Sequence, residues 1–212
     1  MAGADGVVLH LREDRRHIQD RDLHLLRQIL HTKLDLEMAA TDEMVKIALA
    51  VKPDLVTLVP ERREERTTEG GLDLLAHRDA VKRVITALHA AKIPVSLFIE
   101  PHAEQVKTAH RLDADYCELH TGRYAGATRL TEQDEEFERL DQAATFAYKL
   151  GLGVNAGHGL DYRNARRLTK IPEVVEFNIG FSIIARALWV GLERAVREMK
   201  ALVAGERAGE RG

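Results

Sequence analysis

Short apolar runs alternate with longer amphipathic stretches along the whole of this 212-residue chain. In the short runs, apolar residues are continuous or alternate with polar ones, which is typical of β-strands. In the longer stretches, apolar residues recur every three or four positions, which predicts helices that bury one face. The predicted strands are residues 6–12, 33–39, 54–61, 93–100, 115–121, 153–159 and 174–180. The predicted helices are residues 20–31, 41–51, 77–91, 102–112, 134–151 and 182–203.

This order of elements predicts an α/β fold built from about seven consecutive strand–helix units. The strands are largely apolar, as expected for a parallel sheet that is covered on both faces. A doubly wound open sheet would place a glycine-rich phosphate loop after its first strand, and the segment HLREDRRH contains no glycine. We therefore expect a (β/α)8 TIM barrel that forms one domain over residues 1–212, with residues 203–212 as a frayed tail.

The first residues, AGADG, have the pattern of the last turn of a helix with Gly6 near its C-cap. A barrel of this kind needs eight strands, and the pattern supplies about seven. We therefore expect that the first strand and most of the first helix are missing from this chain. Such a barrel would have two unpaired edges, so we expect low stability unless a rearrangement or a neighbouring subunit covers them.

Composition narrows the setting in which the protein works. The net charge is −3, which gives no reason to expect nucleic acid or membrane partners. Cys117 is the single cysteine, so the chain cannot form an internal disulfide, as is common for cytoplasmic proteins. No apolar run reaches the ~18 residues of a membrane span, and the first residues lack a signal-peptide pattern. We expect a cytoplasmic protein in which any phosphorylated substrate needs a local positive site.

Polar residues gather at the C-terminal ends of the predicted strands, where the active sites of TIM barrels lie. Alternation places His10 and Arg12 together on one face of the first run, and Glu118 and His120 together on one face of the fifth. Glu37 holds the equivalent position in the second run. The outer face must be apolar to meet the helices, so these polar side chains are expected to point inward. Burying them costs several kcal/mol each unless they are paired or used, which favours a catalytic site over a solvated barrel mouth without chemistry.

Two glycine-bearing turns, NAGHG and NIGFS, follow the sixth and seventh runs. If the first strand is missing, these runs are barrel strands seven and eight, whose loops commonly bind phosphate. Gly157, Gly159 and Gly180 would let backbone N–H groups approach an anion closely, although ordinary strand-to-helix turns also contain glycine. Arg12 and His17 are further candidates for phosphate or hydroxyl contacts.

The segment PERREERTTEGG, residues 60–71, is long and highly charged. It is either a solvated loop or a lid that expels water when substrate binds. Arg15 and Arg16, in the charged segment after the first run, are expected to lie at the rim or to form ion pairs.

Metal catalysis is an alternative chemistry for these strand ends. His10, Glu37 and His158 are plausible ligands, yet metal sites usually show closely spaced ligands such as His-x-His on one strand. Position 12 is an arginine, whose charge would repel a cation. We therefore expect no metal site.

Several motifs, in order and at compatible spacing, resemble the pyridoxine 5′-phosphate synthase family: HLREDRRHI, LEMA, LVPERREERTTEGGLD, FIE, CELHTGRYA, VNAGHGLDYRN and IPEVVEFNIG. The likeness runs from Ala2 to about Leu202. It implies a (β/α)8 barrel that assembles as a homo-oligomer, an octamer in the well-known members. It implies a ring-closing enzyme that condenses 3-amino-2-oxopropyl phosphate with 1-deoxy-D-xylulose 5-phosphate to pyridoxine 5′-phosphate, phosphate and water, without a metal or organic cofactor.

The resemblance also implies roles for individual residues. His10 and Glu37 correspond to the two general acid/base groups, His158 to the proton donor and Glu118 to a transition-state stabiliser. The implied binders are, for the xylulose phosphate, Arg12, His17 and Thr67 and, for the phosphate of the amino ketone, Gly159, Gly180 and Phe181. The proton transfers of imine formation, dehydration, phosphate loss and ring closure suit groups that titrate near neutral pH.

Two departures from the family bear on activity. The family begins with a strand of the type GVNID-H and a helix with a binding arginine, and neither has a counterpart here. The family usually has histidine where this chain has Phe181. The alternative to an active synthase is therefore a barrel that serves only as a phosphate-ligand-binding or assembly subunit. Another aldolase or isomerase of this fold is a third possibility, but a Schiff-base aldolase needs a strand-end lysine that none of the runs offers.

Overall fold

The computed structural model describes residues 2–61, 68 and 70–204. The strands are β1 (Gly6–His10), β2 (Lys33–Met38), β3 (Leu55–Leu58), β4 (Val95–Ile99), β5 (Tyr116–His120), β6 (Gly153–Gly157) and β7 (Val174–Asn178). The helices are α1 (Asp20–Ile29), α2 (Asp42–Val51), α3 (Arg78–Ala90), α4 (Ala103–Arg111), α5 (Gly122–Gly126), α6 (Leu130–Lys149), α7 (Ala165–Leu168), α8 (Phe181–Val190) and α9 (Leu192–Ala204).

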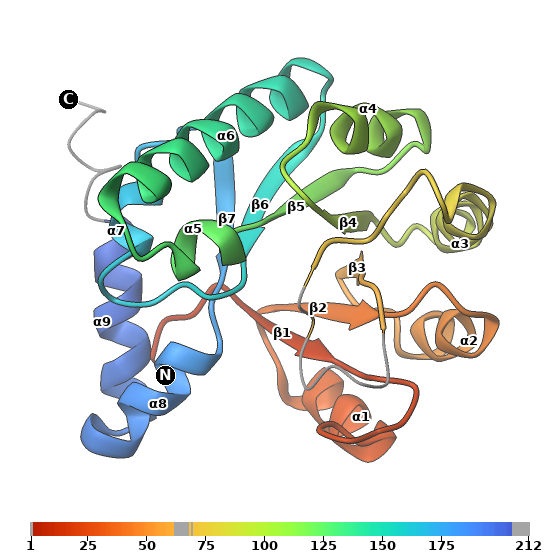
Figure 1. The fold of residues 1–212 in the computed structure, drawn as a ribbon. Helices are drawn as coiled ribbons and strands as arrows, with labels where there is room; N and C mark the ends of the chain where they lie inside the picture. Colours follow the sequence, from red (N-terminus) through yellow and green to blue (C-terminus); the bar gives the residue numbers. More distant parts are fainter. Residues whose placement is uncertain (1, 62–67, 69, 205–212) are drawn as a thin grey trace.

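The strands lie in sequence order, from β1 to β7, in one curled sheet, and every neighbouring pair is parallel. The sheet occupies the centre of the molecule and the larger helices surround it (Figure 1). The predicted TIM-barrel class is therefore confirmed, with seven strands in the part of the chain that the structure describes. There, β1 pairs only with β2 and β7 only with β6, so the barrel is open between β1 and β7.

The core lies between the outer face of the sheet and the helices around it. In β2, Leu34, Leu36 and Met38 are fully buried and belong to this core. Because side chains alternate along a strand, Asp35 and Glu37 point to the opposite, inner face. The same alternation repeats in β5 and β6, so the polar residues of the inner face are positioned by apolar packing outside the barrel.

Two carboxylates anchor the first residues of strands at the other end of the barrel. Asp54 accepts the backbone N–H of Leu34 at 2.9 Å. Asp115 accepts the backbone N–H of Val95 at 2.8 Å and lies 2.8 Å from Nε2 of His89. These contacts hold β2 and β4 in register with their neighbours, and the register decides which side chains meet at the opposite rim.

The structure differs from the sequence-based prediction near both chain termini. The segment AGADG contains no helical turn, because residues 2–4 are irregular and β1 already begins at Gly6. The predicted helix over residues 182–203 is two helices, since Gly191 adopts φ +80°, outside the helical region, and ends α8. The tail was predicted to begin at residue 203, but α9 extends to Ala204; residues 205–212 lie outside the described residues.

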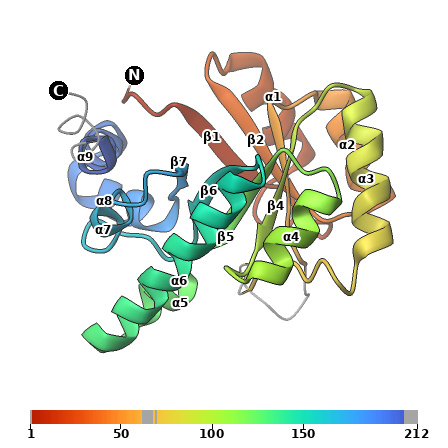
Figure 2. The ribbon, with the colours of Figure 1, turned by 90° about the horizontal axis from the view of Figure 1, so that it is seen from above.

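A cleft of about 1920 Å³ lies along the open side of the barrel, between β1, β7, α8 and α9. Seen from above, α8 and α9 group beside β7, apart from α1–α4 (Figure 2). No residue of α8 is buried, and Phe181, Leu188 and Trp189 are 90%, 84% and 86% exposed. Although α8 is apolar, none of the described helices combines the length and apolarity that crossing a bilayer requires.

Candidate active site

Four polar side chains meet inside the barrel at the C-terminal ends of its strands. His10 ends β1 beside Glu37 of β2, and Nδ1 of His10 is 3.8 Å from Oε2 of Glu37. Glu118 lies on β5, and its Oε1 is 3.8 Å from Nδ1 of His158, which follows β6. The two pairs are electrostatically linked, because Glu118 and His158 both act on the pKa of Glu37. The structure thus brings the four predicted catalytic residues into one site.

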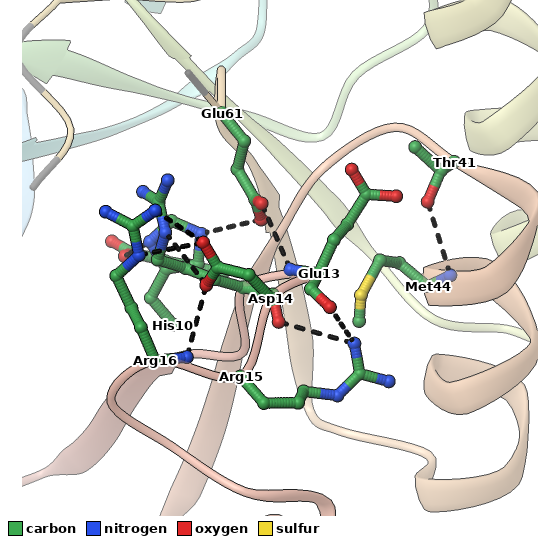
Figure 3. A network of polar contacts seen from close by, with 10 residues as sticks. His10, Glu13, Asp14, Arg15, Arg16, Thr41, Met44 and Glu61 are labelled. Carbon is green, nitrogen blue, oxygen red and sulfur yellow. Dashed lines mark hydrogen bonds and ion pairs between the residues drawn. The ribbon is translucent and has the colours of Figure 1, made fainter. Parts of the chain in front are cut away.

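Glu61 holds His10 through the ring nitrogen that does not face Glu37 (Figure 3). Nε2 of His10 lies 3.1 Å from Oε1 of Glu61, whose Oε2 accepts the backbone N–H of Glu13 at 3.0 Å. Burial acts to raise the pKa of Glu61, but the hydrogen bonds from His10 and Glu13 outweigh burial and lower the pKa. An ionised carboxylate only accepts hydrogen bonds, so Nε2 carries the proton and Nδ1 faces Glu37.

The two buried carboxyl groups of β2 have raised pKa values. For Glu37 the main cause is burial, and the charge of Glu118 adds to it, while the nearby histidines act in the opposite direction. For Asp35, which is only 4% exposed, burial and the charges of Glu118 and Glu37 raise the pKa well above its usual value. Oγ1 of Thr57 donates to Oδ2 of Asp35 at 2.8 Å. Both carboxyl groups therefore keep a proton to a higher pH than a solvated carboxyl group does.

Glu118 is fully buried and is held by residues of β6 and β7. Asn178 donates from Nδ2 to Oε2 of Glu118 at 2.8 Å. Gly157 leaves the space that the carboxylate occupies, because a Cβ at this position would overlap with Oε1. Oε1 faces His158 and has no hydrogen-bond partner within the described chain. A buried acceptor without a partner costs ~1–3 kcal/mol.

His158 combines a strained backbone with a raised pKa. Its φ is 80°, which is uncommon for a residue with a Cβ. Its ring packs against Phe98 with centroids 4.2 Å apart, and Oγ1 of Thr121 donates to its carbonyl oxygen at 2.5 Å. Burial acts to lower the pKa of the imidazole, but the close contact with Glu118 and the charges of Glu118 and Glu37 outweigh burial and raise the pKa. Such a combination is typical of functional sites.

The residues predicted to bind substrate lie in different places. Gly159, Gly180 and Phe181 line the cleft on its β7 side, and Gly159 adopts φ +74°. Arg12 is 2% exposed just beyond the end of β1. His17 is exposed in the loop between β1 and α1. The structure therefore places these three residues in the same cleft as His10, Glu37 and His158, whereas His17 lies at the surface.

The charged segment 60–71 is described only in part. Thr67, which was predicted to bind substrate, lies outside the described residues, so its role and that of a lid stay predictions. Near the C-terminal end of the segment, the backbone N–H of Gly71 donates to Oε1 of Glu100 at 2.9 Å.

The two arginines expected at the rim form ion pairs, which confirms that prediction; Figure 3 shows the pair of Arg16 and Asp14. Nε of Arg15 donates to Asp20 at 2.9 Å. Nη2 of Arg16 donates to Asp14 at 2.5 Å. Both arginines therefore hold the loop after β1 in place.

Sequence reasoning missed several residues of the site besides Glu61. Asn155 is buried beside Glu118 in register, and Glu100, directly after β4, lies 2.7 Å from the ring of His120. Their place at strand ends on the inner face was a usable signal, but their partners are distant in sequence. Among the described residues, no three His, Cys, Asp or Glu side chains are arranged to hold a metal ion.

Comparison with known proteins shows which family this chain resembles. The family model described as "Pyridoxal phosphate biosynthesis protein PdxJ" matches residues 1–205. Pyridoxine 5′-phosphate synthase of Syntrophobacter fumaroxidans is 58% identical over 205 residues, which are 97% of this chain and 86% of that protein. The enzyme of the same name from Geotalea daltonii is 57% identical over 96% of this chain and 85% of that protein.

A solved structure matches at the level of the fold. Phosphoribosyl anthranilate isomerase from Thermus thermophilus superposes with a TM-score of 0.62 at 13% identity, covering 97% of this chain and 90% of that one. At this identity the likeness supports the barrel architecture alone. The sequence matches go further, and they show that the chain belongs to the PdxJ family of pyridoxal phosphate biosynthesis proteins.

Proposed function

We propose that this chain is a pyridoxine 5′-phosphate synthase. It would condense 3-amino-2-oxopropyl phosphate with 1-deoxy-D-xylulose 5-phosphate to give pyridoxine 5′-phosphate, phosphate and water. The observation that carries the proposal is the meeting of two carboxyl groups and two histidines at the barrel mouth: His10, Glu37, Glu118 and His158. Imine formation, dehydration, phosphate loss and ring closure all move protons, and each positioned acid or base contributes ~10²–10⁴-fold.

Glu37 and His10 are proposed to act as bases. Glu61 holds the proton of His10 on Nε2, so the lone pair of Nδ1 is turned towards Glu37. The raised pKa of Glu37 brings this carboxyl group closer to neutral pH, where a base can also return the proton that it removes. Two adjacent acceptors suit a reaction in which several protons leave the substrates in succession.

His158 is proposed as the proton donor and Glu118 as the stabiliser of positive charge in the transition state. The raised pKa of His158 keeps the imidazole protonated to a higher pH. Nδ1 of His158 and Oε1 of Glu118 are 3.8 Å apart, and neither has a hydrogen-bond partner among the described residues. The buried carboxylate therefore faces the imidazole closely enough to stabilise its protonated form.

The phosphate groups are proposed to bind at the rim of the cleft. Gly159 and Gly180 let backbone N–H groups approach an anion, and Gly180 precedes α8, whose N-terminus favours negative charge. The amino ketone phosphate is assigned to these glycines and Phe181. The xylulose phosphate is assigned to a second set, which comprises Arg12, His17 and Thr67.

Product formation from the two substrates tests this proposal. The wild-type protein should form pyridoxine 5′-phosphate, and Glu37→Gln should lower turnover by about 10²–10⁴-fold without loss of the thermal unfolding transition. Glu104→Gln, at an exposed position of α4, is the matched control and should leave turnover unchanged. Binding of the phosphorylated substrates without turnover would favour a barrel that only binds ligand. Absence of both binding and turnover would contradict either function.

We also propose that the protein forms a homo-oligomer, an octamer by family resemblance, in the cytoplasm. The exposed apolar side chains of α8 support self-association, because a second copy would remove them from water. The free, buried thiol of Cys117 suits a reducing compartment. Trp189→Glu should lower the molar mass measured by light scattering, and a monomeric wild-type protein would contradict self-association.

A further inference from the structure

A further carboxylate–histidine pair is formed by Glu100 and His120, and His120 lines the cleft. His120 is the last residue of β5 and shares the inner face with Glu118, while Glu100 directly follows β4. Nδ1 of His120 is 2.7 Å from Oε1 of Glu100. The same oxygen accepts the backbone N–H of Gly71 at 2.9 Å. The reaction proposed above gives neither side chain a role.

Glu100 decides which nitrogen of His120 is turned towards the cleft. The hydrogen bond from His120 is the main cause of the lowered pKa of Glu100 and outweighs burial, so this carboxylate is ionised at neutral pH. An ionised carboxylate accepts and cannot donate, so Nδ1 of His120 carries a proton. Nε2 is then the nitrogen left for another partner, as an acceptor in the neutral ring and a donor in the imidazolium.

Aromatic contacts fix the plane of the His120 ring. Phe98 meets it edge-on, with centroids 5.1 Å apart and planes at 65°. His158 meets it at 82° with centroids 5.7 Å apart, and Phe98 also packs on His158. Phe98 therefore holds His120 at a fixed distance from the proposed proton donor, which is the preorganisation that a substrate contact needs.

Glycines keep Nε2 of His120 accessible. A Cβ at Gly122 would overlap with Nε2, so a larger residue there would block this atom. Gly122 and Gly159 are neighbours, and both line the cleft together with His120. Among the described residues, Nε2 has no hydrogen-bond partner. The atom thus lies beside Gly122 at the start of α5, and Gly122 neighbours Gly159 in the loop after β6, where barrels of this class commonly bind phosphate.

We propose that His120 contacts the phosphorylated substrate directly, donating from Nε2 to a phosphate oxygen, and that Glu100 is its positioning residue. This inference rests on the proposed function and deepens it by adding a side-chain donor to a phosphate site otherwise made of backbone groups. A bound phosphate favours the imidazolium form of His120, and the carboxylate of Glu100 balances that charge.

Inorganic phosphate and 3-amino-2-oxopropyl phosphate, the substrate assigned to Gly159 and Gly180, are the probes, with binding measured by calorimetry. His120→Asn should weaken phosphate binding about tenfold or more, because a hydrogen bond to a charged group is lost. Gly122→Ala keeps His120 but obstructs Nε2, and it should weaken binding similarly. Glu100→Gln keeps a hydrogen-bond acceptor without the charge and should have an intermediate effect.

The exposed pair of His89 and Asp115, at the other end of the barrel, provides the matched control. His89→Asn breaks a carboxylate–histidine contact of similar length and should leave phosphate binding unchanged. In the wild-type protein, the ¹⁵N resonance of Nε2 of His120 should move when phosphate is added, which requires no substitution. An unmoved resonance, or His120→Asn with wild-type affinity, would overturn the inference.

The same variants separate this inference from the proposed function. If the wild-type protein forms product and His120→Asn is equally active and binds phosphate equally well, only the role of His120 fails. If the wild-type protein binds phosphate through His120 but forms no product, only the synthase function fails. If it binds neither inorganic phosphate nor 3-amino-2-oxopropyl phosphate, both fail.

Discussion

The two sides of the barrel differ in how firmly their residues are held. Strands β2 to β5 are buried along almost their whole length, between the barrel interior and the helices. On the other side, β1 and β7 each have one unpaired edge within the described chain, and α8 has no buried residue. The helices α8 and α9 pack chiefly against one another, and α9 also contacts α7; Figure 2 shows them grouped apart from α1–α4.

The residues proposed for acid–base chemistry and those proposed for phosphate binding are distributed differently between the two sides. Glu37 and Glu118, which need fixed geometry and low exposure for their electrostatic effects, lie on the closed side. The glycines proposed to bind phosphate lie on the open side, where backbone N–H groups can face a ligand. The difference teaches that this fold places the two carboxylates of its acid–base group on the best-packed strands and leaves phosphate binding to its least-packed region.

Core truncations should give the largest contrast between the two sides. Leu36→Ala, on buried β2, should lower the free energy of unfolding by about 2–5 kcal/mol. Leu188→Ala, on exposed α8, should change it by no more than about 0.5 kcal/mol when it is made in the Trp189→Glu background, which is expected not to self-associate. Urea unfolding of both variants in that background provides the measurement. Equal destabilisation there would break the comparison, because it would mean that the chain itself covers α8.

Removing the charge of Asp35 should stabilise the closed side in a pH-dependent way. Its pKa is raised on folding, so its contribution to stability is complete below about pH 4 and is lost as the pH rises through the native pKa. Asp35→Asn should therefore raise the free energy of unfolding at pH 8 by about 1–3 kcal/mol, with little effect near pH 4.

Urea unfolding between pH 4 and pH 8 measures this effect. Asp79→Asn, at an exposed position of α3, is the control and should show no comparable pH dependence. The prediction is wrong if Asp35→Asn and wild type keep the same stability difference at every pH.

Restoring the family histidine should strengthen the open side. Phe181→His places a side-chain donor at the first turn of α8, next to Gly180, and should tighten phosphate binding about tenfold. Leu188→His, equally exposed on the same helix but away from Gly180, should not change it. Calorimetric titration with inorganic phosphate measures the affinity of both variants. Equal affinities would show that position 181 is not part of the phosphate site.

The smallest effect is expected at the contact between Glu61 and His10. Glu61→Gln keeps an acceptor for Nε2 but loses its charge, and should lower kcat about three- to tenfold with KM unchanged. Glu13→Gln, which alters only an exposed side chain, is the control. A rise in KM at constant kcat would instead assign Glu61 to substrate binding.

The periodicity of the chain was enough to predict the class of fold and the direction of the main side chains. A parallel strand covered by helices must turn its apolar residues outward. The sequence alone therefore predicted that the side chains of His10, Glu37 and Glu118 point into the barrel. Strand ends were less well predicted: β3 covers Leu55–Leu58 within the expected 54–61, because local pattern does not show where pairing with neighbours stops.

The partners of these inner residues were decided only by the tertiary structure. Glu61 meets His10 across 51 positions of sequence, and Asn178 meets Glu118 across 60. Such contacts depend on strand register and on the path of loops, which no local period encodes. The positive φ of His158 and the break at Gly191 are also set by what surrounds them. The sequence by itself determined which residues face the barrel interior, whereas the folded chain decided which of them touch, because touching requires the whole sheet to be in place.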